Sequence, residues 1–132
     1  MRNLDTNVLV RYLTADDARQ AARARRLVEQ SRDDQEILFL STVALCELVW
    51  VLSRSYRQPK SAILSALDSI LDTDSFQVEQ EPLVRRSVAA YRAGSGSFAD
   101  YLIGEIGRYA GCRDTVTFDR ALKGSAGFTI LA

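Results

Sequence analysis

The sequence has 132 residues, 47% hydrophobic and 26% charged, which suits one globular domain that buries a core without disulfide or metal staples. Its 17 basic residues balance 17 acidic ones, so the charge excludes a polycationic nucleic-acid binder. The chain has no histidine, which excludes Ser-His-Asp and Cys-His catalysis and His-ligated zinc. Any chemistry must therefore come from carboxylates, hydroxyls, lysine or arginine.

No apolar run approaches the roughly 20 residues that span a bilayer. The first residues lack the basic-then-apolar layout of a signal peptide, and Cys46 and Cys112 belong to no metal-ligand motif. We therefore expect a cytoplasmic protein with reduced thiols.

In the first half of the chain, short apolar runs alternate with amphipathic stretches. From the N-terminus the pattern predicts a strand over 1–5, a helix over 6–13, a polar Arg-rich helix over 16–32, a buried strand over 37–40 and a helix over 42–56. Ser41 or Thr42 is expected to cap the last of these helices.

The second half continues the alternation. A helix is predicted from Pro59 to about Leu71, because its apolar residues recur at helical spacing. The remaining predicted elements are a strand over 76–79, a helix over 82–93, a loop over 94–97, a helix over 98–110 that Gly111 stops, a strand over 114–118, a helical turn over 119–123 and a strand over 128–131. No repeat or linker interrupts them, so residues 1–132 are predicted to form a single domain.

Strands that alternate with helices indicate the α/β class, with a mainly parallel sheet covered by helices on both faces. Ligands of such sheets collect outside the carboxyl ends of the strands. Asp5 and Asp119 both follow predicted strands, so we expect them to be neighbours.

Four acids stand out, and each has a simpler alternative. Asp5 can cap the helix that starts at Thr6. Asp119 can cap the helical turn behind it, and Ser97 with Asp100 matches the capping-box pattern.

The fourth acid is Glu47, which lies in a stretch that is apolar all round and is therefore predicted to be buried. A buried carboxylate is costly unless it is paired or bound to a cation. Arg54 lies seven residues further on the same helix face and is the alternative partner.

Two acids at strand ends, one on a helix and one at a helix start can all face one cleft. Converging carboxylates repel one another, and a divalent cation relieves that repulsion. Mg²⁺ prefers carboxylate oxygens and completes its shell with water and substrate phosphates, so no histidine is needed.

In this order, the residues resemble a PIN-domain ribonuclease of the VapC toxin type. The motifs that carry the resemblance are LDTNVLVRYL at 4–13, ALCELVWVL at 44–52, SFADYLI at 97–103 and TFDRAL at 117–122. The resemblance covers essentially the whole chain. The loop over 94–97 is plainer than in many relatives, which often carry an extra polar or acidic group there.

The resemblance implies a PIN-like three-layer α/β/α fold with a central sheet of four to five strands. It implies Mg²⁺- or Mn²⁺-dependent hydrolysis of RNA phosphodiester bonds, with Asp5, Glu47, Asp100 and Asp119 as metal ligands and catalytic residues. Asn7 and Thr117 match polar positions that would orient carboxylates or water. The ordinary alternatives are a helix-start Asn and a strand Thr.

The resemblance also implies a homodimer and a cognate antitoxin whose tail fills an apolar groove. Candidate groove residues are Leu45, Val49, Leu52 and the helix over 63–71, and the alternative is that all of them are core. Arg11 is a candidate for steering phosphate or, alternatively, a solvated surface side chain or partner contact.

Other functions fit the sequence less well. A catalytically silent PIN-like module would bind RNA or a partner without cutting. A metal-dependent phosphatase of the haloacid-dehalogenase kind needs a second Asp two residues after Asp5, where this chain has Asn7. DNA as the substrate is a further alternative that neutral net charge does not discriminate.

Overall fold

The computed structural model describes residues 1–131. The chain divides into two compact units, Met1–Glu81 and Pro82–Ala132. No helix in the described part of the chain is long and apolar enough to cross a membrane.

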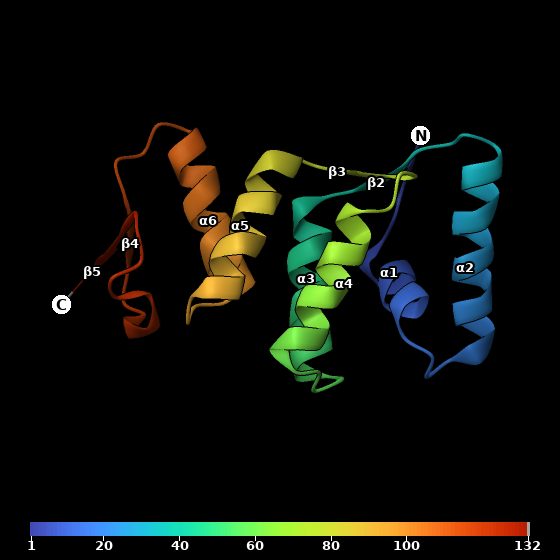
Figure 1. Cartoon of the computed structure of the whole chain (residues 1–132), viewed down its shortest axis with the longest axis horizontal. Coiled ribbons are helices and arrows are strands. Elements are labelled where there is room, and N and C mark those ends of the chain that lie inside the picture. Colours follow the sequence, from blue (N-terminus) through green and yellow to red (C-terminus); the bar gives the residue numbers. More distant parts are fainter. Residues whose placement is uncertain (132) are drawn as a thin grey trace. The chain divides into compact units, whose positions relative to one another are not determined.

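The first unit is a parallel three-stranded sheet with four helices. Its elements are β1 Arg2–Asn3, α1 Thr6–Leu13, α2 Ala18–Asp33, β2 Leu38–Leu40, α3 Thr42–Arg54, α4 Lys60–Leu71 and β3 Phe76–Val78. The strand order is β1-β2-β3, and both pairings are parallel. Helix α1 lies between α2 and α3 (Figure 1).

The core of this unit forms because the central strand and one face of each helix are apolar. Leu38 and Leu40 of β2 are fully buried, as the sequence predicted. The proposed groove residues Leu45, Val49, Leu52, Ile63 and Leu67 are buried too. The alternative that they are core is therefore confirmed, and the prediction of a groove at these side chains is wrong, because buried side chains cannot line an open groove.

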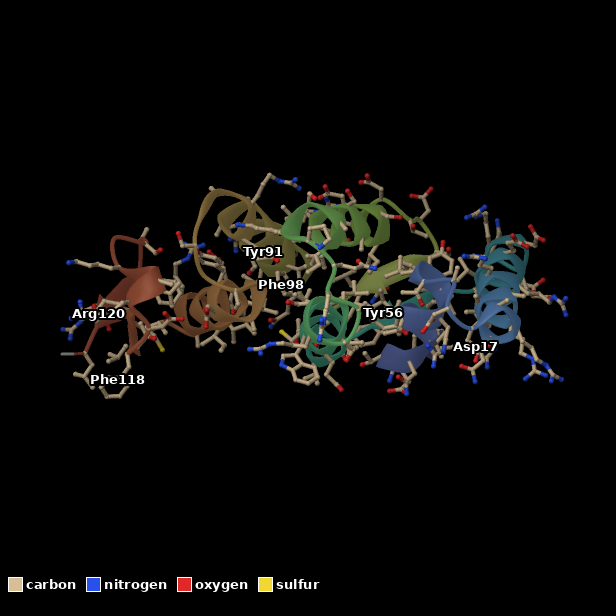
Figure 2. The ribbon with its side chains drawn as sticks, turned by 90° about the horizontal axis from the view of Figure 1, so that it is seen from below. Asp17, Tyr56, Tyr91, Phe98, Phe118 and Arg120 are labelled. Carbon is tan, nitrogen blue, oxygen red and sulfur yellow. The ribbon has the colours of Figure 1, made fainter. Side chains whose placement is uncertain are left out.

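The second unit holds two helices and a parallel pair of strands. Its elements are α5 Glu81–Ala93, α6 Phe98–Tyr109, β4 Thr115–Thr117, the 3-10 turn η1 Arg120–Leu122 and β5 Phe128–Ile130. Tyr91 of α5 and Phe98 of α6 meet edge to face, with ring centroids 6.3 Å apart (Figure 2).

The predicted α/β class with parallel strands is confirmed. Five strands are present among residues 1–131, and they pair as one sheet of three and one of two. Each strand is shorter than predicted, because a strand extends only as far as its neighbour pairs with it: β1 matches β2 at two positions. Helix α3 ends at Arg54 instead of Tyr56, and Pro59 precedes α4 as its N-cap residue.

Candidate active site

Asp5 lies just beyond β1, at the carboxyl edge of the three-stranded sheet. It occupies the N-cap position of α1, but its side chain makes no capping hydrogen bond. The capping alternative is therefore wrong for this carboxylate, although the position was predicted correctly. The side chain is exposed, so both of its oxygens are available to another group.

Glu47 projects from α3, and it is exposed. The prediction that it is buried is wrong, because the apolar residues of α3 are divided between two faces. Ala44, Leu45, Leu48, Val49 and Leu52 face the core, whereas Val43 and Trp50 are 66% and 61% exposed. Glu47 shares this outer face.

The partner of Glu47 is not Arg54, which the sequence suggested as an alternative. No ion pair joins Glu47 to Arg54 within residues 1–131. Instead, the buried hydroxyl of Thr6 donates to Oε1 of Glu47 at 3.4 Å. This contact places the residue that follows Asp5 against the side chain of Glu47.

Asp100 forms the predicted capping box at the start of α6. Its Oδ2 accepts from the backbone N–H of Ser97 at 3.0 Å, and Ser97 Oγ accepts from the N–H of Asp100 at 3.1 Å. The capping alternative is confirmed. It uses one carboxylate oxygen, however, and a carboxylate has two.

Asp119 caps the 3-10 turn η1. Its Oδ1 accepts from the N–H of Ala121 at 2.9 Å, so the capping alternative is confirmed here as well. Thr117 Oγ1 accepts from the N–H of Asp119 at 3.0 Å and holds the backbone at that residue. Asn7, the other supporting residue, is exposed.

In the Pro82–Ala132 unit, the loop that precedes Asp100 contacts the turn that follows Asp119. A Cβ atom added at Gly96 would stand 2.5 Å from Cδ2 of Leu122. Gly96 therefore lets the loop before Asp100 pack directly on the buried last residue of η1, which begins after Asp119.

Each unit thus contributes two of the four acids, Asp5 and Glu47 from the first and Asp100 and Asp119 from the second. Over residues 1–131, no group of three or more Asp, Glu or Cys side chains is placed to hold a metal ion.

The donor chemistry of the four acids fits a hard divalent cation. None of them forms an ion pair with Lys or Arg in the described structure, and each keeps at least one carboxylate oxygen without a hydrogen bond. Free carboxylate oxygens are the ligands that Mg²⁺ and Mn²⁺ prefer.

Sequence reasoning missed Glu79, which lies at the same sheet edge as Asp5. Its Oε1 accepts from both the backbone N–H and the hydroxyl of Thr42, at 2.9 and 3.0 Å. It therefore holds the first residue of α3, the helix that carries Glu47. The rule that drew attention to Asp5 and Asp119, an acid directly behind a strand, applies equally to Glu79 behind β3.

Arg11 belongs to a polar cluster within the first unit. Its guanidinium donates to Gln20 Oε1 at 2.6 Å, to Tyr56 Oη at 3.0 Å and to Asp16 Oδ1 at 3.4 Å. These contacts engage the partly exposed side chain with the protein's own surface groups and leave the phosphate-steering hypothesis without support.

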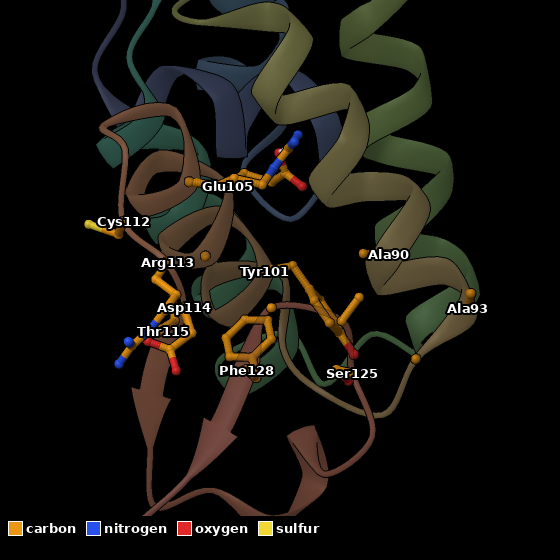
Figure 3. A pocket seen from close by; sticks show the side chains of 15 residues that line it. Ala90, Ala93, Tyr101, Glu105, Cys112, Arg113, Asp114, Thr115, Ser125 and Phe128 are labelled. Atoms are coloured by element: carbon orange, nitrogen blue, oxygen red, sulfur yellow. Dashed lines mark hydrogen bonds and ion pairs between the residues drawn. The ribbon is translucent and has the colours of Figure 1, made fainter.

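The second unit contains a cavity of about 320 Å³ that neither Asp100 nor Asp119 lines. Tyr101 and Phe128 meet edge to face there, and Glu105 and Arg108 also line it (Figure 3). Partial burial raises the pKa of Glu105, but hydrogen bonds from Arg86 and Arg108 outweigh it and lower the pKa overall. The wall of the cavity thus contains an ion pair between Glu105 and Arg108.

Burial disfavours Cys46 as an alternative nucleophile. Cys46 and Cys112 are both free thiols. Burial raises the pKa of the Cys46 thiol, which disfavours the reactive thiolate.

Comparison with known proteins now decides the family. The model of the PIN domain matches residues 3–126 and so spans both units. The chain belongs to the PIN-domain family. A VapC ribonuclease of Aquifex aeolicus (strain VF5) is 28% identical over 123 residues, which are 93% of this chain and 90% of that protein.

Among solved structures, this PIN domain is similar to VapC20 of Mycobacterium tuberculosis, described as a toxin that cleaves the sarcin-ricin loop. The TM-score is 0.47 and the identity 21%, over 94% of this chain and 95% of the other.

Proposed function

We propose that this PIN domain is a metal-dependent endoribonuclease toxin of the VapC type, which hydrolyses RNA phosphodiester bonds and is inhibited by a cognate antitoxin. The observation that carries the proposal is the set of four unpaired carboxylates at the positions of the family motifs. The similarity to the VapC ribonuclease of Aquifex aeolicus supports it over nine-tenths of the chain.

In this proposal, Asp5, Glu47, Asp100 and Asp119 together bind one or two Mg²⁺ or Mn²⁺ ions. Such ions make bound water a usable nucleophile near neutral pH and neutralise charge on the phosphate. Asp100 and Asp119 keep one oxygen each on their caps, so capping orients the carboxylates that bind the cation. Thr6 orients Glu47, and Asn7 and Thr117 are proposed as supporting residues.

A site of this kind needs the two units to act as one PIN domain over 1–132. The family model, which matches residues 3–126 without division at residue 81, supports this. We further propose that the protein acts in the cytoplasm as a homodimer, with RNA and an antitoxin as its macromolecular partners.

The test is cleavage of structured and unstructured RNA by the purified full chain without a partner protein. Mg²⁺ and Mn²⁺ should each support cleavage, and EDTA, Asp5→Asn or Asp100→Asn should abolish it. Asp72→Asn is the matched control, because Asp72 is an exposed acid at the C-terminal end of α4. This variant should cut RNA as the wild-type protein does.

Metal binding gives a readout besides activity. Calorimetric titration with Mn²⁺ should show binding to the full chain that each of the four single Asn or Gln variants weakens at least tenfold. Binding of Mn²⁺ that none of these variants changes would contradict the assignment. RNA binding without cleavage by a protein that binds Mn²⁺ would favour the silent module.

A further inference from the structure

The outer face of α3 carries three chemically different side chains in one line, Glu47, Trp50 and Arg54. We call this line the α3 stripe. The spacings of three and four residues put all three on the same side of the helix. Trp50 is the only tryptophan of the chain, and 61% of its surface is exposed. The stripe thus places a large exposed ring between an acid and a base.

Neither charged end of the stripe is neutralised by the protein. Glu47 accepts one long hydrogen bond, from Thr6 at 3.4 Å. Arg54 is exposed and makes no ion pair or side-chain hydrogen bond with the described residues. The two are about 10 Å apart along the axis, at a rise of about 1.5 Å per residue, too far to pair with each other.

We propose that the α3 stripe binds the RNA strand, with the Trp50 ring stacked on a nucleobase beside the scissile phosphate and Arg54 bound to a neighbouring phosphate. The inference rests on the proposed function, because Glu47 is there the ligand of the ion at the scissile phosphate. Aromatic rings stack on any base, and a guanidinium matches the geometry of a phosphate.

The charges of the stripe favour RNA over a protein surface as the occupant. A protein that covered Trp50 would also cover Glu47 and Arg54 and would have to desolvate two separate, unpaired charges. An RNA strand leaves neither charge uncompensated. It brings phosphates to Arg54 and to the cation at Glu47, and a base to the ring between them.

The single tryptophan makes the inference directly measurable. The probe is a single-stranded RNA of 12 nucleotides with mixed sequence, added with Mg²⁺ to full-length Asp5→Asn protein, which should not cut it. The free protein should show the emission of a water-exposed indole, and RNA should quench it to saturation. Emission that is already shifted to shorter wavelength and that RNA leaves unchanged would mean that protein covers the ring, and would overturn the inference.

Kinetics of the active protein supply the second test. Trp50→Ala should raise KM for the 12-nucleotide RNA about 5- to 100-fold, the range that loss of one base stack produces, while Trp50→Phe restores most of the affinity. Mn²⁺ affinity should not change in either variant. Tyr109→Ala, which removes another exposed ring, is the control.

Arg54→Ala should reduce the dependence of RNA affinity on salt by about one phosphate contact, whereas Arg26→Ala on α2 should not. Failure of this inference differs from failure of the proposed function. If the wild-type protein cuts RNA and the Trp50 and Arg54 variants cut it equally well, only the stripe is refuted. If RNA quenches Trp50 but no metal supports cleavage, RNA binding by the α3 stripe stands, whereas the ribonuclease proposal and the placement of Trp50 beside a scissile phosphate both fall.

Discussion

Thr6 donates its hydroxyl to Oε1 of Glu47 at 3.4 Å, across 41 positions of the sequence. Thr6 is 6% exposed and directly follows Asp5, whereas Glu47 lies on the outer face of α3. One buried hydroxyl therefore connects the neighbour of the first acid with the second acid. It also holds Glu47 in place without an ion pair, which leaves the charge of the carboxylate available.

Thr6→Val should remove this donor while keeping the shape of the side chain. Hydrogen bonds to charged groups contribute about 1.5–3 kcal/mol, and this bond is long at 3.4 Å, so we take the low end and expect the Mn²⁺ affinity and the rate of RNA cleavage to fall about 10-fold. Thr6→Ser keeps the hydroxyl and is the control. Equal Mn²⁺ titrations for wild type and Thr6→Val would show that the hydrogen bond does not orient Glu47.

Glu79→Ala should destabilise the start of α3. The variant leaves the N–H and the hydroxyl of Thr42 without their shared acceptor. Loss of a helix-capping acceptor costs about 1–2 kcal/mol, which urea unfolding should detect as a lower midpoint with an unchanged slope. Glu79→Gln retains an acceptor oxygen and should lose less stability. An unchanged urea midpoint in Glu79→Ala would refute the role of Glu79 in holding the start of α3.

The cluster around Asp16 should make stability depend on acid pH. A hydrogen bond from Tyr56 is the main cause that lowers the pKa of Asp16 below its ordinary value of 3.8, helped by Thr14 and Arg11. Because the pKa of Asp16 is lower in the folded state, the cluster stabilises the fold fully at pH values above the pKa of Asp16 in the unfolded chain. This contribution is lost as the pH falls through the lowered pKa of the folded state.

The measurement is the free energy of unfolding of wild type and Asp16→Asn between pH 6 and pH 2. The difference in free energy of unfolding between the two proteins should be constant at pH values above the ordinary pKa of Asp16. It should shrink towards pH 2. Asp72→Asn, at the C-terminal end of α4, should run parallel to wild type. A gap for Asp16→Asn that does not close would contradict the assignment.

Ser75→Ala should stabilise the protein. The hydroxyl of Ser75 is buried and has no hydrogen-bond partner among the described residues, so its removal relieves a desolvation penalty of about 1 kcal/mol. We expect a rise in Tm of about 3–5 °C. Ser87→Ala is the contrasting control, because the buried Ser87 hydroxyl donates to the carbonyl of Leu83 at 2.8 Å, and its loss should lower Tm.

The sequence alone was sufficient for the order of the elements and the parallel α/β class. These features depend on local chemistry. Ser41 and Ser97 cap helices that start one residue later, and Gly111 follows α6 with a positive φ of 99°. Such contacts join residues three or four positions apart, so a reader of the sequence can find them.

Tertiary structure decided which side chains are free to act. The sequence indicated a buried Glu47 and a capping Asp5, and both indications were wrong. An apolar helix does not reveal which of its faces packs on the core, and a capping position does not reveal where its carboxylate turns. Similarly, Arg11 donates a hydrogen bond to Tyr56, which lies 45 positions away in the sequence. Contacts of this range form only when packing brings elements together, so spacing along the chain cannot specify them.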